Sequence, residues 1–112
     1  MKVREIPASQ WPAFLERLGR EQRAWLATLE RGGRVEMREQ PLESIAAQGG
    51  IDIHIGARVI HVHEPQAVRV AETAEGATQA LDIDDVSGQH LTVRFNIAPP
   101  ASVIDGIAPA ER

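Results

Sequence analysis

Hydrophobic and polar positions alternate along most of this chain, but the first stretch repeats with a helical period. Four large apolar side chains recur at i, i+3, i+4 and i+7, the spacing of one face of a helix. They are Trp11, Phe14, Leu15 and Leu18. Ser9 is expected to cap this helix, and Pro12 to lie in its first turn, where a missing N–H costs little. The pattern predicts one amphipathic helix over about residues 10–22.

From Trp25 onward the period changes to two, which is typical of half-buried β-strands. Seven segments follow it, separated by short Gly-rich or polar connections: WLATLE, RVEMRE, IDIHI, RVIHVHE, AVRVAET, QALDIDD and HLTVRFN. PLESIAA is either a further strand or an irregular crossing. We expect an α+β fold in which the helix packs on a curled antiparallel β-meander of six to seven strands, with a partly closed barrel as an open alternative.

The chain of 112 residues has room for one domain with one core. We expect residues 1–97 to form this domain. Residues 98–112 are rich in proline and follow no strand period, so we expect a flexible C-terminal tail. A short docking segment around Val103 and Ile104 would be the one ordered part of that tail.

The segment GGIDIHIGARVIHVHEP, residues 49–65, holds three of the four histidines. Gly56 and Ala57 fit a two-residue hairpin turn, which would place Ile53 opposite Ile60. The same register sends Asp52 and His61 to the polar face as direct cross-strand neighbours. Alternation alone therefore predicts an Asp–His pair.

A second hairpin is expected around residues 85–88. A turn that ends with Gly88 in the left-handed conformation would close Asp85 onto Gln89. Asp84 would then face His90 across the strands. Both Asp–His pairs can be formed for purely structural reasons.

Asp52, His54, His61 and His63 are the candidate ligand-binding residues. The His-x-His spacing of 61–63 is one by which strand-borne imidazoles chelate a metal ion, and His54 could be a third ligand. Exposed strand histidines without a dry pocket are more often solvated, so we expect no metal site, no cofactor and no catalytic residue. A hydrolase or isomerase that uses an Asp–His pair is the less favoured alternative.

Composition excludes several function classes. The chain contains no cysteine, which removes disulfides and thiolate chemistry. No apolar run is long enough for a membrane helix, and the N-terminal residues lack the apolar core of a signal peptide, so we expect a cytoplasmic protein without a membrane partner. The net charge of −4 and the four Phe and Trp residues argue against a nucleic-acid partner, which requires a basic surface with stacking aromatics.

The order of several segments resembles a small bacterial family, domain of unknown function 5335. The matching features are REIP followed by Trp11 and Phe14-Leu15, Trp25, PL at 41–42 with Ile45, His61 before Pro65, VRVAETAEGATQALDI and LTVRF. The resemblance covers about residues 1–97 and is most specific from Val68 to Ile83. The family is expected to show a His-Val-x-His pattern, but Arg58 stands in place of the first histidine, which argues against a shared two-histidine ligand. No activity comes with the resemblance.

These observations favour a non-catalytic binding or protein-interaction module. Small-ligand or divalent-metal binding through the histidine-bearing hairpin is the alternative. An open sheet has two edges that can pair with another chain, and the expected edge strands WLATLE and HLTVRFN contain neither lysine nor proline to oppose this. We therefore expect a homodimer through a strand edge or the adjoining sheet face, with His54 and His61 outside the interface.

Overall fold

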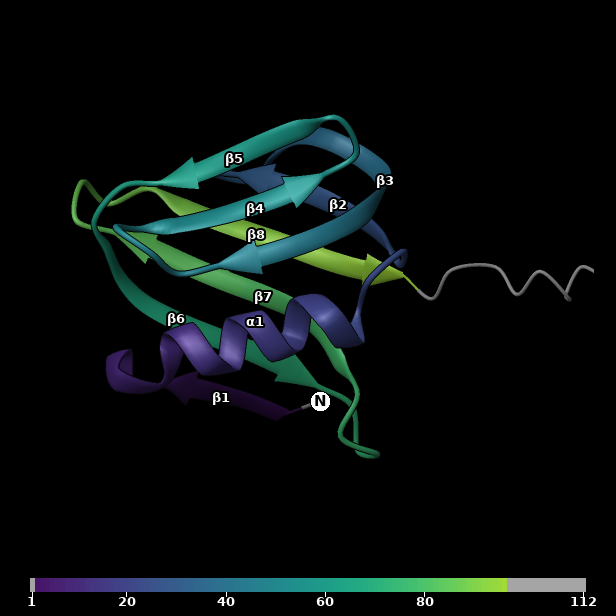
Figure 1. Ribbon diagram of the computed structural model, residues 1–112, viewed down its shortest axis with the longest axis horizontal. Coiled ribbons are helices and arrows are strands. Elements are labelled where there is room, and N and C mark those ends of the chain that lie inside the picture. The colour runs from purple at the N-terminus through teal and green to yellow at the C-terminus, as the bar shows by residue number, and fades with distance from the viewer. Residues whose placement is uncertain (1, 97–112) are drawn as a thin grey trace, which may run out of the picture.

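The structure is a computed structural model that describes residues 2–96, and it contains one α-helix and eight antiparallel strands (Figure 1). A 3-10 turn, Ala8–Gln10, precedes the helix α1, Trp11–Glu21. The strands are β1 (Lys2–Ile6), β2 (Leu26–Arg31), β3 (Arg34–Ala46), β4 (Ile51–Ile55), β5 (Arg58–Val62), β6 (Pro65–Glu72), β7 (Thr78–Asp85) and β8 (His90–Asn96). Their order in the sheet is β1-β6-β7-β8-β2-β3-β4-β5. The α+β class expected from the sequence is confirmed.

The sheet has more strands than the six to seven expected, and it stays open. β1 and β5 are its two edges, so the partly closed barrel is not formed. β1 is the strand that was not expected, because its segment KVREI is short, only its last residue is buried and it shows no clear alternation of apolar and polar residues. PLESIAA is not a separate strand, since it continues RVEMRE within the long strand β3.

The strand order also differs from a simple meander. β2 to β5 form one meander and β6 to β8 form another, and the two are joined because β8 pairs with β2. WLATLE and HLTVRFN therefore lie side by side in the middle of the sheet, and the expectation that they form its edges is wrong. Alternation identifies strands and the faces they bury, but it does not determine which strands pair over a long distance in the chain.

Strand β3 pairs with β2 along its first part, from Arg34 to Pro41, and with β4 along its last part, from Leu42 to Ala46. Glu39 has a positive φ of 53° where the register with β2 shifts, and its N–H donates to Thr28 Oγ1 at 3.2 Å. Because a bulge bends a strand, this irregularity helps β4 and β5 to fold back over the core (Figure 1).

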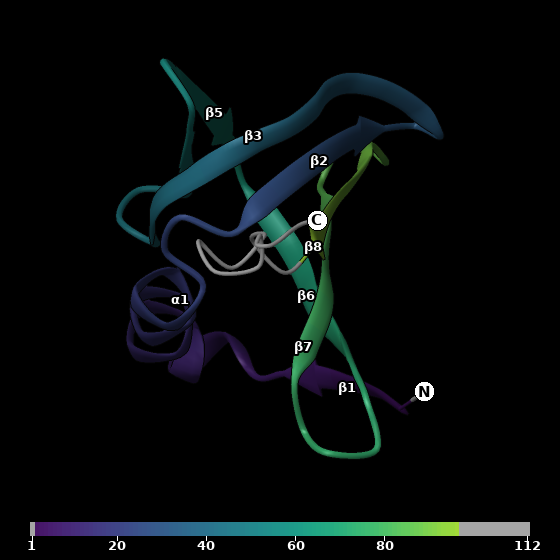
Figure 2. The same ribbon diagram turned by 90° about the vertical axis from the view of Figure 1, so that its right-hand side faces the viewer.

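The hydrophobic core fills the space between the curled sheet and α1. Phe14, Leu15 and Leu18 of the helix are buried in it, as their spacing predicts. α1 lies along β3 at the open side of the sheet, with β1 on its other side (Figure 2). The indole Nε1 of Trp11 donates to the carbonyl oxygen of Ile6 at 2.8 Å, which ties the start of the helix to the end of β1.

The start of the helix differs in one detail from the expectation. Gln10 occupies the N-cap position, and no side chain caps the helix. Ser9 lies inside the 3-10 turn, which the N–H of Gln10 closes by donating to the carbonyl of Pro7 at 2.8 Å. The prediction that Ser9 is the cap is therefore wrong, because a backbone turn takes that place.

The tail expected over residues 98–112, with Val103 and Ile104, lies outside the described residues. Between residues 2 and 96, the single α-helix is too short and too polar to cross a bilayer.

Candidate functional site

The histidine-bearing hairpin β4–β5 has the predicted register. Ile53 pairs with Ile60 and Asp52 with His61, around a turn in which Gly56 has a φ of 58°. The isoleucines are buried, whereas the side chain of His61 is 47% exposed. His61 Nδ1 lies 2.5 Å from Asp52 Oδ1, so the predicted Asp–His pair is confirmed. The carboxylate fixes the ring orientation and leaves Nε2 as the nitrogen that could contact a ligand.

The other two candidate residues are not drawn into this pair. His54 shares the outer face of the hairpin with Asp52, and it pairs in register with Val59 and Ser44. His63 follows the end of β5 with a side chain that is 79% exposed, and its Nε2 lies 3.9 Å from Glu64 Oε2. The rings of His61 and His63 are 6.2 Å apart between centroids. In the part of the chain that the structure describes, no three His, Asp or Glu side chains lie close enough together to hold a metal ion.

Gly50 lies close to the ring of His61 and to the backbone of Val62. Its φ is 119°, and a Cβ atom built on it would lie 2.6 Å from the carbonyl oxygen of Val62 and 2.9 Å from Cε1 of His61. Only glycine fits here, because the backbone conformation and the close approach both exclude a side chain. The glycine before β4 thus lets the imidazole of His61 come close to the backbone at the start of that strand.

A small cavity of about 130 Å³ lies beside the two histidines at the end of β5. Its polar lining comes from His61 and His63 on one side and from Arg31, Asp85 and Gln89 on the other. Pockets for drug-sized ligands are several times larger. This cavity is suited to a water molecule or a small ion.

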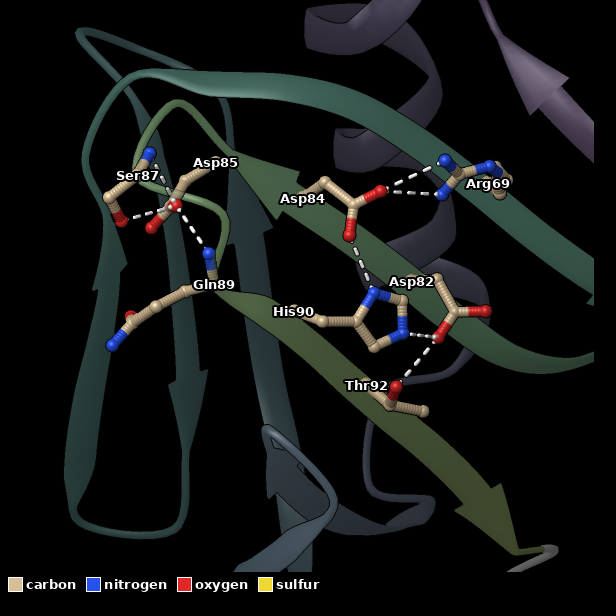
Figure 3. A network of polar contacts seen from close by, with 8 residues as sticks. All are labelled: Arg69, Asp82, Asp84, Asp85, Ser87, Gln89, His90 and Thr92. Atoms are coloured by element: carbon tan, nitrogen blue, oxygen red, sulfur yellow. Dashed lines mark hydrogen bonds and ion pairs between the residues drawn. The ribbon is translucent and has the colours of Figure 1, made fainter.

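The second Asp–His pair is also confirmed, and it belongs to a larger network on the outer face of the sheet (Figure 3). His90 Nδ1 lies 2.5 Å from Asp84 Oδ1, and His90 Nε2 lies 3.2 Å from Asp82 Oδ1. Arg69 donates to Asp84 through both terminal nitrogens, at 2.9 and 3.0 Å. Thr92 donates its hydroxyl to Asp82 at 2.7 Å. Strands β6, β7 and β8 are thus connected by side chains as well as by the backbone.

The network favours the charged forms of His90 and Asp84. The hydrogen bond with Asp84, followed by the charge of Asp82, raises the pKa of His90 above its ordinary 6.5. The hydrogen bonds from His90 and then Arg69 lower the pKa of Asp84. When protonated, His90 can donate from both ring nitrogens, to Asp84 and to Asp82. These contacts connect β7 and β8.

Sequence reasoning missed Arg69 and Asp82 as parts of this network. Asp82 faces Thr92 in the β7–β8 register, next to the predicted pair of Asp84 and His90, so the turn closed by Gly88 already indicates its place. Arg69 contacts Asp84, and this contact depends on the β6–β7 register, in which Val68 pairs with Ile83. The connection between β6 and β7 is longer than a two-residue turn, and the pairing of the two strands shifts its register next to Glu72. A short two-residue turn, such as Gly56-Ala57, would have made that register predictable.

The free edge of β5 is a second candidate for function. Ile55 and Arg58 flank a two-residue turn and form a hydrogen-bonded pair, so hydrogen-bonded pairs recur at Ile60 and Val62. The N–H and C=O groups of Val59 and His61 therefore point away from β4. β5 is the last strand of the sheet, and no strand among residues 2–96 pairs with that side.

Comparisons of the chain with family models, with curated proteins and with solved structures find no match. The resemblance to domain of unknown function 5335 therefore stays a prediction.

Proposed function

We propose that this chain is a non-catalytic protein-interaction module that associates through the free edge of β5, with a second copy of itself as the partner. The observation that carries the proposal is an unprotected edge strand. Val59, the second residue of β5, is 55% exposed, and the strand contains neither lysine nor proline. Natural proteins usually protect edges with such residues, because unpaired backbone groups invite another strand.

The other edge is less suited to pairing. β1 carries Lys2, Arg4 and Glu5, and Pro7 follows directly after it. Charged side chains of this kind oppose pairing of an edge with another strand. The contrast between the two edges favours β5 over β1.

The β5 edge is complementary to itself. In an antiparallel pair of two β5 strands with Ile60 on the two-fold axis, Val59 faces His61 of the second copy. Both residues direct their N–H and C=O groups outward, so they would form a hydrogen-bonded pair. Arg58 would face Val62, and no like charges would meet. This geometry places His61 inside the interface, in contrast to the expectation from the sequence.

Sedimentation across protein concentrations from about 1 µM to several hundred µM tests the proposal. The wild type is expected to shift from a monomer to a dimer. Val59→Lys is expected to remain a monomer, because a charged lysine at the edge opposes pairing with the second strand. Val3→Lys on β1 and Val86→Lys on the β7–β8 turn are matched controls, since both valines are exposed, at 62% and 54%. A wild type that is monomeric throughout, or a Val59→Lys variant that dimerises like the controls, contradicts the proposal.

Small-ligand binding is the second candidate, and the cavity beside His61 and His63 limits the ligand to about the size of a small ion. A metal ion is not the expected occupant, because no three His, Asp or Glu side chains among the described residues lie close enough together to hold one. Titration calorimetry with zinc should therefore detect no sub-micromolar binding. Tight binding that is lost in the double variant His61→Ala, His63→Ala would establish a metal site and overturn this expectation.

We also propose that the chain is a bacterial protein located in the cytoplasm. Fractionation of cells that express the chain would test the location.

A further inference from the structure

The tips of two hairpins meet at one end of the molecule and border an open cavity of about 730 Å³. The β2–β3 tip contributes Arg31, Arg34 and Glu36, and the β7–β8 tip contributes Gln89 and His90. The N–H of Gly32 donates to the carbonyl oxygen of His90 at 2.8 Å, which joins the two tips. This cavity is distinct from the free edge of β5.

Two arginines lie in the wall of this cavity. Arg31 and Arg34 are direct cross-strand partners on either side of the turn formed by Gly32 and Gly33. Like charges placed directly opposite each other destabilise a strand pair unless an anion lies nearby.

One carboxylate offsets only part of this charge. Glu36 Oε2 lies 2.9 Å from Nε of Arg31, and Arg31 Nη1 donates to Gln89 Oε1 at 3.2 Å. The N–H at Arg31 Nε is nevertheless buried without an acceptor in hydrogen-bonding geometry. Arg34 forms no ion pair with any residue that the structure describes.

His90 does not add an uncompensated charge. Its ring faces Asp84 and Asp82 on β7, and Arg69 on β6 also faces Asp84. On β2, Glu30 is engaged by Arg94 of β8. Among the residues that line this cavity, Arg31 and Arg34 carry two positive charges, against the single carboxylate of Glu36. Asp85, at the base of the β7–β8 tip, accepts hydrogen bonds from the N–H groups of Ser87 and Gln89.

We propose that Arg31 and Arg34 bind a small oxyanion, a phosphate or carboxylate group, in this cavity. Guanidinium groups match the geometry of such anions with two parallel N–H donors, and Glu36 and Gln89 hold Arg31 in place beforehand. The ligand would be a small phosphorylated or carboxylated molecule, because the cavity volume is that of a small-molecule site.

A titration followed by amide NMR spectra tests the site, with inorganic phosphate and succinate as separate probes at constant ionic strength. Saturable shifts are expected at Gly32, Gly33, Gly88 and Gln89. Arg34→Gln should weaken binding roughly tenfold, the loss of a charge-assisted hydrogen bond. The affinity of Arg34→Lys for the anion should lie between those of the wild type and Arg34→Gln, because lysine keeps the charge without the two parallel donors.

Arg38→Gln is the matched control, since Arg38 is an exposed arginine on the same strand that does not line this cavity. It should bind like the wild type. Saturation by one probe alone would identify the anion class. Shifts that stay linear in anion concentration, or equal losses in Arg34→Gln and Arg38→Gln, would overturn the proposal.

Discussion

At the scale of single residues, His90 connects the outer face of the sheet, because both of its ring nitrogens face aspartate oxygens. The pair formed with Asp84 raises the pKa of His90 in the folded chain above the ordinary value of 6.5. A raised pKa means that the folded state binds the proton more tightly than the unfolded state. The resulting stabilisation is fully present below about pH 6.5, and it disappears as the pH rises through the pKa of the folded state.

His90→Gln should therefore lower the free energy of unfolding at pH 5.5 more than at pH 9. We expect a difference of about 0.5–1 kcal/mol, the size typical of exposed ion pairs, since the His90 side chain is 47% exposed. Urea unfolding at a series of pH values measures it. His63→Gln serves as the control, and an equal effect of His90→Gln at both pH values would disprove the role of the imidazolium.

Gly50 offers a test of the close packing around His61. Gly50→Ala should lower the free energy of unfolding by about 2 kcal/mol or more, because a strained φ combines with a collision against the carbonyl of Val62. Gly76→Ala is a matched control with a φ of 90° and open space, and it should cost only about 1 kcal/mol. Similar losses in both variants would show that the approach of His61 and Val62 is not tight.

The positions of both Asp–His pairs follow from local rules that act on a few residues. A two-residue turn sets the register of Asp52 and His61, and a turn closed by Gly88 sets that of Asp84 and His90. Local rules could not predict the contacts of Arg69 and Arg31. The contact of Arg69 depends on the longer connection between β6 and β7, and that of Arg31 depends on the meeting of two separate hairpins.

At the scale of elements, the contact of α1 with β3 depends on Gly19. A Cβ atom at this position would lie 2.7 Å from the backbone nitrogen of Ile45, so the helix approaches the strand at a distance that only glycine allows. Alanine is favoured over glycine in a helix by about 1 kcal/mol when nothing else intervenes. Here the collision with the strand should exceed that gain.

Gly19→Ala is thus expected to destabilise the protein by about 1–3 kcal/mol, the usual cost of overpacking. Thermal and urea unfolding measure the change. Glu16→Ala on the exposed face of the same helix should stay within about 0.5 kcal/mol of the wild type. A stabilised Gly19→Ala variant would contradict the close contact between α1 and β3.

The elements themselves differ in how well the sequence predicts them. Helix α1 and the strands from β4 to β8 have clear apolar periods because each buries one face. β1 buries only Ile6 of its five residues, and its place beside β6 is determined by tertiary contacts. The bend of β3 near Glu39 likewise depends on packing against two different strands.

At the scale of the whole molecule, the pairing of β8 with β2 determines which edges are free. This pairing brings together residues from Arg31 and Leu91, 60 positions apart, to Leu26 and Asn96, 70 positions apart, and it leaves β5 and β1 at the ends of the sheet. Helix α1 covers the core between β3 and β1, whereas β5 ends the sheet at the opposite end of the strand order from β1 (Figure 1). The proposed self-association follows from this arrangement.

The most direct test is amide hydrogen exchange at Val59 and His61, measured at low and at high protein concentration. The N–H groups of these residues point away from β4, so we expect them to exchange more slowly as the concentration rises and the edge becomes paired. Arg58 and Ile60, already paired with β4, and residues 2–5 of β1 should show no such dependence. If Val59 and His61 exchange at the same rate at every concentration, β5 is not the association surface.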